Sequence, residues 1–296
     1  MNTIKKTGLI FGVILLSGTL IHSVSYKNHP NTETKSDRYY PTSVNFCGEE
    51  TPLHLSDVKE RFDRELIINS NLHASTLIII KRANREFPII EPILKKYGVP
   101  DDFKYLAVAE SALTNATSSA GAKGFWQFMP ATAKERGMEV TDEVDERYHL
   151  IKSTEAACKY LLDAKQKMGS WTLAAASYNG GLAGVNRQIT SQGENNYYDL
   201  LLTEETYRYV FRILALKEIL QNPDKYGYTY RQDELYNAIP TRTVTVDSSI
   251  TDLAKFAKGQ GINYKILKIH NPWLRDKKLT NTSRKKYDIE IPTKGY

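Results

Sequence analysis

The feature that most constrains the fold is a helical period of apolar residues, which runs from Ser56 to about Asn222. Its clearest repeat is Val58, Phe62 and Leu66. Successive helices are separated by breaks at Pro88, Pro92, Gly98, Gly137, Gly169, Asn179-Gly180-Gly181 and Asn222-Pro223. Residues at i and i+4 share one face of a helix, so the pattern predicts amphipathic helices packed around one core. We therefore expect residues 56–230 to form one mainly α-helical domain.

Three of these helix boundaries carry specific expectations. Pro88 and Pro92 are expected to begin a short helix that Gly98 ends. Asn179-Gly180-Gly181 is expected to break the helix that begins at Trp171. The helix that begins near Asp101 should end soon after Glu110, because residues 114–119 are poor helix formers.

The two ends of the chain differ from this middle part. Lys5 and Lys6 precede an apolar run over residues 8–21, and small residues follow, which is the layout of a secretory signal peptide. We expect residues 1–25 to be that signal, with an uncleaved anchor that would hold the protein at the membrane as the alternative. The polar residues 26–55 are expected to be a linker. Both alternatives predict an exported protein of the periplasm or cell envelope.

The charge and the cysteine content limit which binding partners and ligands this chain can have. The net charge of +6 is small and scattered, which argues against a nucleic-acid partner and suits an anionic polymer such as a cell wall. Cys47 and Cys158 are the only cysteines. After export they could form one disulfide, or remain two unrelated buried thiols. The two cysteines and the six histidines do not have the spacing of metal ligands, so we expect no metal. We also expect no cofactor and a monomeric protein.

The C-terminal residues 240–296 predict a second, smaller unit. Residues 241–246 and 287–291 alternate apolar and polar side chains as strands do, and residues 250–258 and 266–269 have helical character. Strand, two helices and strand indicate a small α/β module, which we expect to be separable from the helical domain.

Glu110 is the candidate for chemistry. It is a lone carboxylate among Ala, Val and Leu in the last turn of its helix, where the helix dipole and the poor solvation both favour the protonated form. A carboxyl group that is partly protonated near neutral pH can act as a general acid. Taken singly, Glu110 could also be a surface residue, Trp126 and Phe128 core residues, and Asn179-Gly180-Gly181 a plain turn.

Four ordered motifs nevertheless resemble those of the lytic transglycosylase domain, in its membrane-bound branch. They are Glu110-Ser111, Gly121-x-x-Gly124-x-Trp126-Gln127-Phe128-Met129-Pro130, Ser177-Tyr178-Asn179-x-Gly181 and Glu205-Thr206-x-x-Tyr209-Val210. The resemblance spans roughly residues 87–220 and implies a goose-type lysozyme fold. Two departures are Ser177 in place of the usual Ala and Phe128 in place of a more common Ile.

The resemblance implies an enzyme that cleaves peptidoglycan glycan strands between N-acetylmuramic acid and N-acetylglucosamine, with a 1,6-anhydro product. Glu110 would be the single acid and base. The implied substrate-binding set is Ser111, Gln127, Met129, Tyr178, Asn179, Glu205 and Tyr209. Within it, Ser111 and Tyr209 would orient Glu110, while Gln127, Tyr178 and Asn179 would hold acetamido groups. Glu205 would bind substrate across the cleft, or would simply be an acid placed at a helix N-terminus.

The C-terminal module resembles a LysM peptidoglycan-binding module. Residues 245–250, Asn271-Pro272-x-Leu274 and Ile289-x-Ile291-Pro292 follow that pattern, although the usual Gly-Asp-Thr opening is missing. The module is therefore expected either to bind glycan or to be a structural remnant.

Two other functions remain open from the sequence. A hydrolase of the same fold would need a second acid, for which Asp142, Asp145 and Glu205 are the candidates. A wall-binding scaffold without activity would keep the fold and the tail but would have no need of Glu110.

Overall fold

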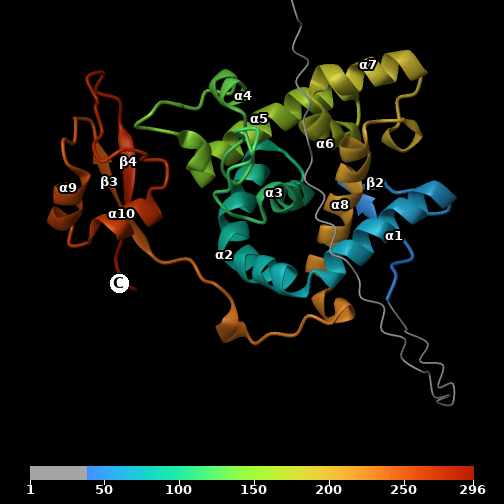
Figure 1. Cartoon of the computed structure of the whole chain (residues 1–296), viewed down its shortest axis with the longest axis horizontal. Helices are drawn as coiled ribbons and strands as arrows, with labels where there is room; N and C mark the ends of the chain where they lie inside the picture. The colour runs from blue at the N-terminus through green and yellow to red at the C-terminus, as the bar shows by residue number, and fades with distance from the viewer. Residues whose placement is uncertain (1–38) are drawn as a thin grey trace, which may run out of the picture. The chain divides into compact units, whose positions relative to one another are not determined.

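The structure, a computed structural model, describes residues 39–296 of the chain (Figure 1). The expected signal peptide and the expected linker up to residue 38 lie outside these described residues. The helices are α1 (Ser56–Asn71), α2 (His73–Tyr97), α3 (Lys104–Ser111), α4 (Pro130–Glu135), α5 (Leu150–Met168), α6 (Trp171–Gly180), α7 (Leu182–Gln192), α8 (Glu204–Gln221), α9 (Leu253–Gly259) and α10 (Tyr264–His270). The strands are β1 (Asn45–Phe46), β2 (Glu49–Glu50), β3 (Thr241–Val246) and β4 (Tyr287–Pro292). The expected mainly helical fold is confirmed.

Helices α6 and α8 form the centre of the helical domain. Helix α8 packs against α1, α3 and α6, and α5 packs against both α2 and α6. The residues from Thr172 to Ser177 in α6 are all buried, so this part of the helix is surrounded by other elements, as a central helix must be. The apolar faces that the helical period predicts therefore pack together in one core.

Two predicted helix boundaries are wrong. Helix α2 continues through Pro88 and Pro92 as far as Tyr97 instead of beginning at these prolines. A proline inside a helix costs about 3 kcal/mol, but α2 buries Ile90 and Leu94 fully, and this packing outweighs the cost. Helix α6 likewise includes Asn179 and Gly180 and ends only at Gly181.

The described part of the expected linker belongs to the core. Strands β1 and β2 pair as a short antiparallel hairpin, and the fully buried ring of Phe46 meets that of Phe103 with centroids 5.1 Å apart. The Glu49 carboxylate accepts hydrogen bonds from the backbone N–H groups of Trp171 (2.6 Å) and Thr172 (2.8 Å) at the start of α6. An acid at a helix N-terminus satisfies free N–H groups and the dipole. Residues 39–55 are therefore not a linker.

Cys47 and Cys158 are both free thiols in the structure, so the expected disulfide is absent. Cys47 lies in the turn between β1 and β2, where the Asp102 carboxylate accepts a hydrogen bond from its backbone N–H. Cys158 lies in the buried face of α5. The structure therefore agrees with the alternative of two separate thiols, which both pack in the core of the helical domain.

The C-terminal module has the predicted strand–helix–helix–strand order. Strands β3 and β4 pair antiparallel from Thr241 opposite Pro292 to Val246 opposite Tyr287. The core of the module also contains Val144 and Tyr148, which come from the segment between α4 and α5 of the helical domain. The module is therefore not packed as an independent unit. Within residues 39–296, no helix is both long enough and apolar enough to cross a membrane.

Both thiols should react slowly in the folded protein. Burial raises the pKa of the Cys158 thiol to about 12, and burial together with Asp102 and Glu49 raises the pKa of Cys47 well above its ordinary value. Since the thiolate is the reactive form, we expect little alkylation by iodoacetamide under native conditions and two modified thiols per chain after unfolding without reductant. Failure to alkylate the unfolded, unreduced protein would instead demonstrate a disulfide.

Candidate active site

Glu110 lies in the last turn of α3, a short helix whose other residues are mostly buried. The helix ends because Ala112 and Leu113 both adopt positive φ angles, +52° and +56°. Positive φ is uncommon for residues other than glycine and is tolerated where surrounding packing fixes it. The turn away from the helix leaves the Glu110 carboxylate half-buried against α8.

The Glu110 carboxyl group is held by Tyr209 of α8. The Tyr209 hydroxyl donates a hydrogen bond to Glu110 Oε1. Burial raises the pKa of Glu110 to about 7, and the nearby charge of Glu205 adds to the rise. The Tyr209 hydrogen bond and the Arg212 guanidinium act in the opposite direction. A carboxyl group with a pKa near neutrality can both give and take a proton, which suits proton transfer in both directions.

Residues 121–128, which we call the 121–128 turn, form the second part of the site. The Lys123 N–H donates to Phe128 O (3.1 Å), and Gln127 has a positive φ of +49°. The Gln127 side-chain amide donates to Ala116 O (3.1 Å) and Gly124 O (2.8 Å). Both amide hydrogens are thus used inside the loop, and only the Oε1 atom of Gln127 remains for a ligand.

Trp126 and Phe128 are core residues. The Trp126 side chain is fully buried, and its indole N–H donates to Thr154 Oγ1 of α5 at 2.9 Å. Phe128 is also buried. Neither ring is free to stack on a sugar, so the plain core interpretation of these two aromatics is correct.

The end of α6 provides the third part of the site. The Tyr178 hydroxyl donates to the carbonyl oxygen of Trp126 at 2.8 Å, and its ring packs edge-on against Phe128 with centroids 5.9 Å apart. The Asn179 side chain donates to Glu205 Oε1 (3.1 Å) and accepts from Thr206 Oγ1 (2.8 Å). Residues far apart in sequence are therefore joined into one polar group beside Glu110.

The remaining predicted residues lie at different depths. The Ser111 hydroxyl donates to Ala107 O (3.2 Å) and accepts from the Thr114 N–H (3.3 Å), so it stabilises the end of α3. Met129 is exposed at the start of α4. Arg212, which was not predicted, modulates the pKa of Glu110. Its position one helical turn after Tyr209 was the available signal.

The acids proposed for a hydrolase differ in their availability. Asp145 is buried and forms a bidentate pair with Arg147, with distances of 2.9 Å and 2.7 Å. Asp142 is exposed at the tip of the hairpin formed by residues 139–147. Glu205 is the one of the three whose charge acts on Glu110. Within residues 39–296, no three His, Cys, Asp or Glu side chains are grouped as metal ligands would be.

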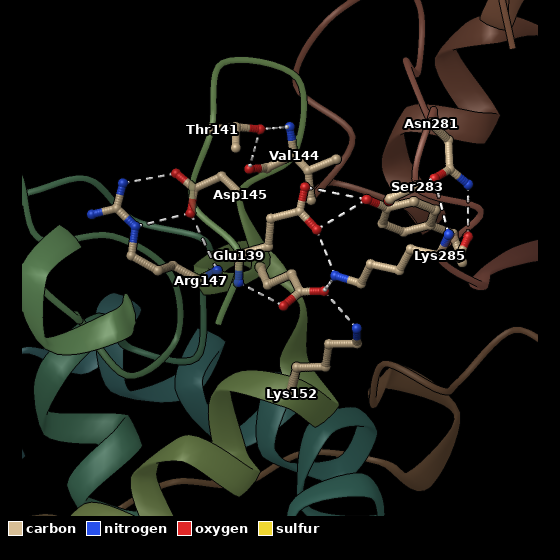
Figure 2. Close-up of polar contacts among 11 residues, drawn as sticks. Glu139, Thr141, Val144, Asp145, Arg147, Lys152, Asn281, Ser283 and Lys285 are labelled. Atoms are coloured by element: carbon tan, nitrogen blue, oxygen red, sulfur yellow. Dashed lines mark hydrogen bonds and ion pairs between the residues drawn. The ribbon is translucent and has the colours of Figure 1, made fainter. Parts of the chain in front are cut away.

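Arg147 links this hairpin to the 121–128 turn. Its Nη1 group donates to Gly121 O at 3.1 Å and to Phe128 O at 3.2 Å, while Asp145 holds the other side of the guanidinium (Figure 2). The backbone approach is so close that a Cβ atom on Gly124 would lie 1.8 Å from Arg147 O. Arg147 matches none of the four sequence motifs and was not among the predicted site residues.

Two parts of the chain are similar to known protein families. Residues 87–201 match the transglycosylase SLT domain, and residues 242–295 match the soluble lytic transglycosylase C-terminal LysM-like domain. Glu110, the 121–128 turn and Tyr178 lie within the first match, whereas Glu205 and Tyr209 lie beyond its end.

Two similar full-length proteins are the membrane-bound lytic murein transglycosylases D of Escherichia coli strains K12 and O6:H1. Each is 32% identical over 236 residues, which cover 76% of this chain and 50% of the relative. The chain thus spans about half the length of these relatives.

The close approach at Gly124 makes a testable prediction. Gly124 (φ +83°) and Gly121 (φ +90°) both have left-handed backbone, but nothing lies within 4 Å of a Cβ on Gly121. Gly121→Ala should cost about 1–2 kcal/mol of unfolding free energy from strain alone. Gly124→Ala should cost at least about 3 kcal/mol, because backbone must also move. Equal losses in urea unfolding would contradict the close approach.

Proposed function

We propose that this chain, which carries a transglycosylase SLT domain and a LysM-like C-terminal domain, is a peptidoglycan lytic transglycosylase. It would cleave the β-1,4 bond between N-acetylmuramic acid and N-acetylglucosamine and form a 1,6-anhydromuramic acid end. The observation that supports this most directly is the half-buried Glu110, with a pKa of about 7 and a hydrogen bond from Tyr209.

In the first step, protonated Glu110 gives its proton to the glycosidic oxygen. The C1–O bond of the muramic residue breaks, the N-acetylglucosamine side leaves as an alcohol, and C1 becomes oxocarbenium-like. The acetamido carbonyl of the same sugar stabilises C1. The anionic carboxylate that remains on Glu110 is stabilised by the Tyr209 hydroxyl and by the charge of Arg212.

In the second step, Glu110 acts as a base. It takes the proton from the C6 hydroxyl of the muramic residue as that oxygen bonds to C1, which closes the 1,6-anhydro ring and regenerates protonated Glu110. No water is consumed, so one carboxyl group serves both steps. A pKa near 7 matches this double use, because neither state of the group is strongly favoured.

The arrangement of the other acids favours this reaction over hydrolysis. A hydrolase would need a second carboxylate to position water or to act as a nucleophile. Asp145 is committed to Arg147, and Glu205 accepts a hydrogen bond from Asn179. A scaffold without activity is disfavoured because it would have no use for a carboxyl group whose pKa burial raises to about 7.

The setting of the reaction follows from its substrate. Peptidoglycan lies outside the cytoplasmic membrane, so the chain would work in the cell envelope. Residues 1–25 would serve as the export signal or remain as a membrane anchor. The LysM-like domain would add glycan binding to the catalytic domain.

Replacing Glu110 tests the assignment. Glu110→Gln keeps size and hydrogen bonding but cannot deliver a proton, so turnover of purified peptidoglycan should fall at least about 10²–10⁴-fold. Asp142→Asn, a matched loss of one carboxylate at an exposed site, should keep wild-type activity. Mass spectrometry of wild-type digests should show muropeptides one water lighter than hydrolysis products. Reducing muramic ends would assign a hydrolase, and an active Glu110→Gln variant would remove Glu110 from the reaction.

The pH dependence provides a second test. The free enzyme must hold Glu110 protonated, so kcat/KM should fall as pH rises through about 7, the pKa to which burial raises this group. The Tyr209 hydrogen bond lowers that pKa. Tyr209→Phe should therefore move the alkaline limb to higher pH, while reducing the maximal rate because the anionic form loses its donor. A limb that stays in place or moves to lower pH would contradict this role of Tyr209.

A further inference from the structure

The hairpin of residues 139–147 is the part of the helical domain that meets the C-terminal module. Its two sides are joined by Thr141 N–H to Val144 O (2.7 Å) and by Glu146 N–H to Glu139 O (2.9 Å). The Glu146 carboxylate also accepts from the Glu139 N–H at 2.8 Å. The hairpin therefore has its own fixed shape. The carboxylates of Glu139, Glu143 and Glu146 all contact side chains of the C-terminal module.

The module holds this hairpin by backbone and by side chains. The Asp145 N–H donates to Trp273 O (2.9 Å), and the Arg275 N–H donates to Glu143 O (2.8 Å). Figure 2 shows Lys285 of the module reaching Glu139, and it also contacts Glu146 at 3.2 Å. Further polar contacts join the module to the hairpin, among them Tyr287 OH to Glu139 Oε2 (3.0 Å), Thr280 Oγ1 to Glu143 Oε1 (3.0 Å) and Lys278 to Glu143 (3.2 Å).

The other end of the same hairpin reaches the active site. Arg147 binds the carbonyl oxygens of Gly121 and Phe128, which are the two ends of the 121–128 turn. Tyr148, whose ring is part of the module's core, shares a hydrogen bond of 3.0 Å with Thr117 just before the turn. The 121–128 turn also holds Tyr178 beside Glu110, because the carbonyl oxygen of Trp126 accepts a hydrogen bond from the Tyr178 hydroxyl.

Residues 112–149 need such support, because their one regular α-helix is the six-residue α4. Long irregular segments open locally at low free energy unless they are tied down elsewhere. The Asp145–Arg147 pair is almost fully buried, and a buried pair keeps its geometry only while its surroundings stay in place. The hairpin and the module provide these surroundings.

We propose that the C-terminal module is a positioning element of the active site. Lys285 and Tyr287 hold the hairpin in place through Glu139 and Glu146. The hairpin in turn fixes the position of Arg147, which holds the 121–128 turn. Lys285 is accordingly a positioning residue that acts through Arg147. The expected effect on catalysis rests on the proposed function, whereas the expected support of the 121–128 turn by the module does not. The module would thus serve catalysis even on soluble glycan fragments, whether or not it binds glycan itself.

The test compares two lysine variants of the full chain. Lys285→Met removes the contacts with Glu139 and Glu146, while Lys258→Met removes one positive charge from an exposed position of α9. Hydrogen–deuterium exchange should become about tenfold faster in residues 121–128 of Lys285→Met and should not change in Lys258→Met. On soluble glycan fragments, kcat of Lys285→Met should fall about tenfold with little change in KM, because misplacement near the reacting group costs rate more than binding. Lys285→Arg, which keeps the charge, should restore both.

The outcomes separate the two ideas. Faster exchange limited to the hairpin, an unchanged kcat, or faster exchange spread evenly over the helical domain would each overturn the positioning role. If the wild type releases no anhydro product, the proposed function fails, while the exchange of residues 121–128 still decides whether the module holds the turn.

Discussion

The packing of α3 against α8 is the constraint on which the site depends. It partly buries Glu110 and brings the Tyr209 hydroxyl onto the carboxylate, with Arg212 one turn further along. Burial alone would keep the acid protonated, and full exposure would keep it ionised. Burial and the charge of Glu205 raise the pKa of Glu110, the Tyr209 hydrogen bond and Arg212 lower it, and the balance places it near 7. A single group can then act as acid and base in successive steps.

The irregular segment between α3 and α5 depends on contacts made from outside it. Thr154 of α5 accepts from the Trp126 indole, Tyr178 of α6 donates to Trp126 O, and Arg147 binds both ends of the turn. These bonds satisfy backbone groups that no regular ladder satisfies. They also explain why Trp126 and Phe128 are buried: these aromatic residues anchor the turn, and the Oε1 atom of Gln127 remains for a ligand.

Sequence periodicity predicted most of the helices but not their continuity or their partners. Gly98, Gly137 and Gly169 were correctly predicted to end helices, since these ends depend on local backbone conformation. Pro88 and Pro92 predict the start of a helix, yet the buried residues of α2 continue the helix through both prolines. The polar stretch that contains Phe46 predicts a linker, because a single buried aromatic residue produces no periodic pattern. The disulfide was proposed from cysteine count, which contains no information on distance.

Glu110 could be singled out as a candidate from the sequence because its signal is local: a lone acid at the end of an apolar helix, followed by ordered motifs. The helical class and the α/β tail could likewise be predicted from local sequence patterns. Which groups tune the pKa of Glu110, and which hold the turn beside it, depends on the tertiary structure. The contact of Tyr209 with Glu110 joins residues that are 99 positions apart in the sequence. Arg147 and Phe128 are 19 positions apart, and Lys285 and Glu146 are 139 positions apart. Hydrogen bonds and burial depend on distances in space, and these are fixed only when the helices pack.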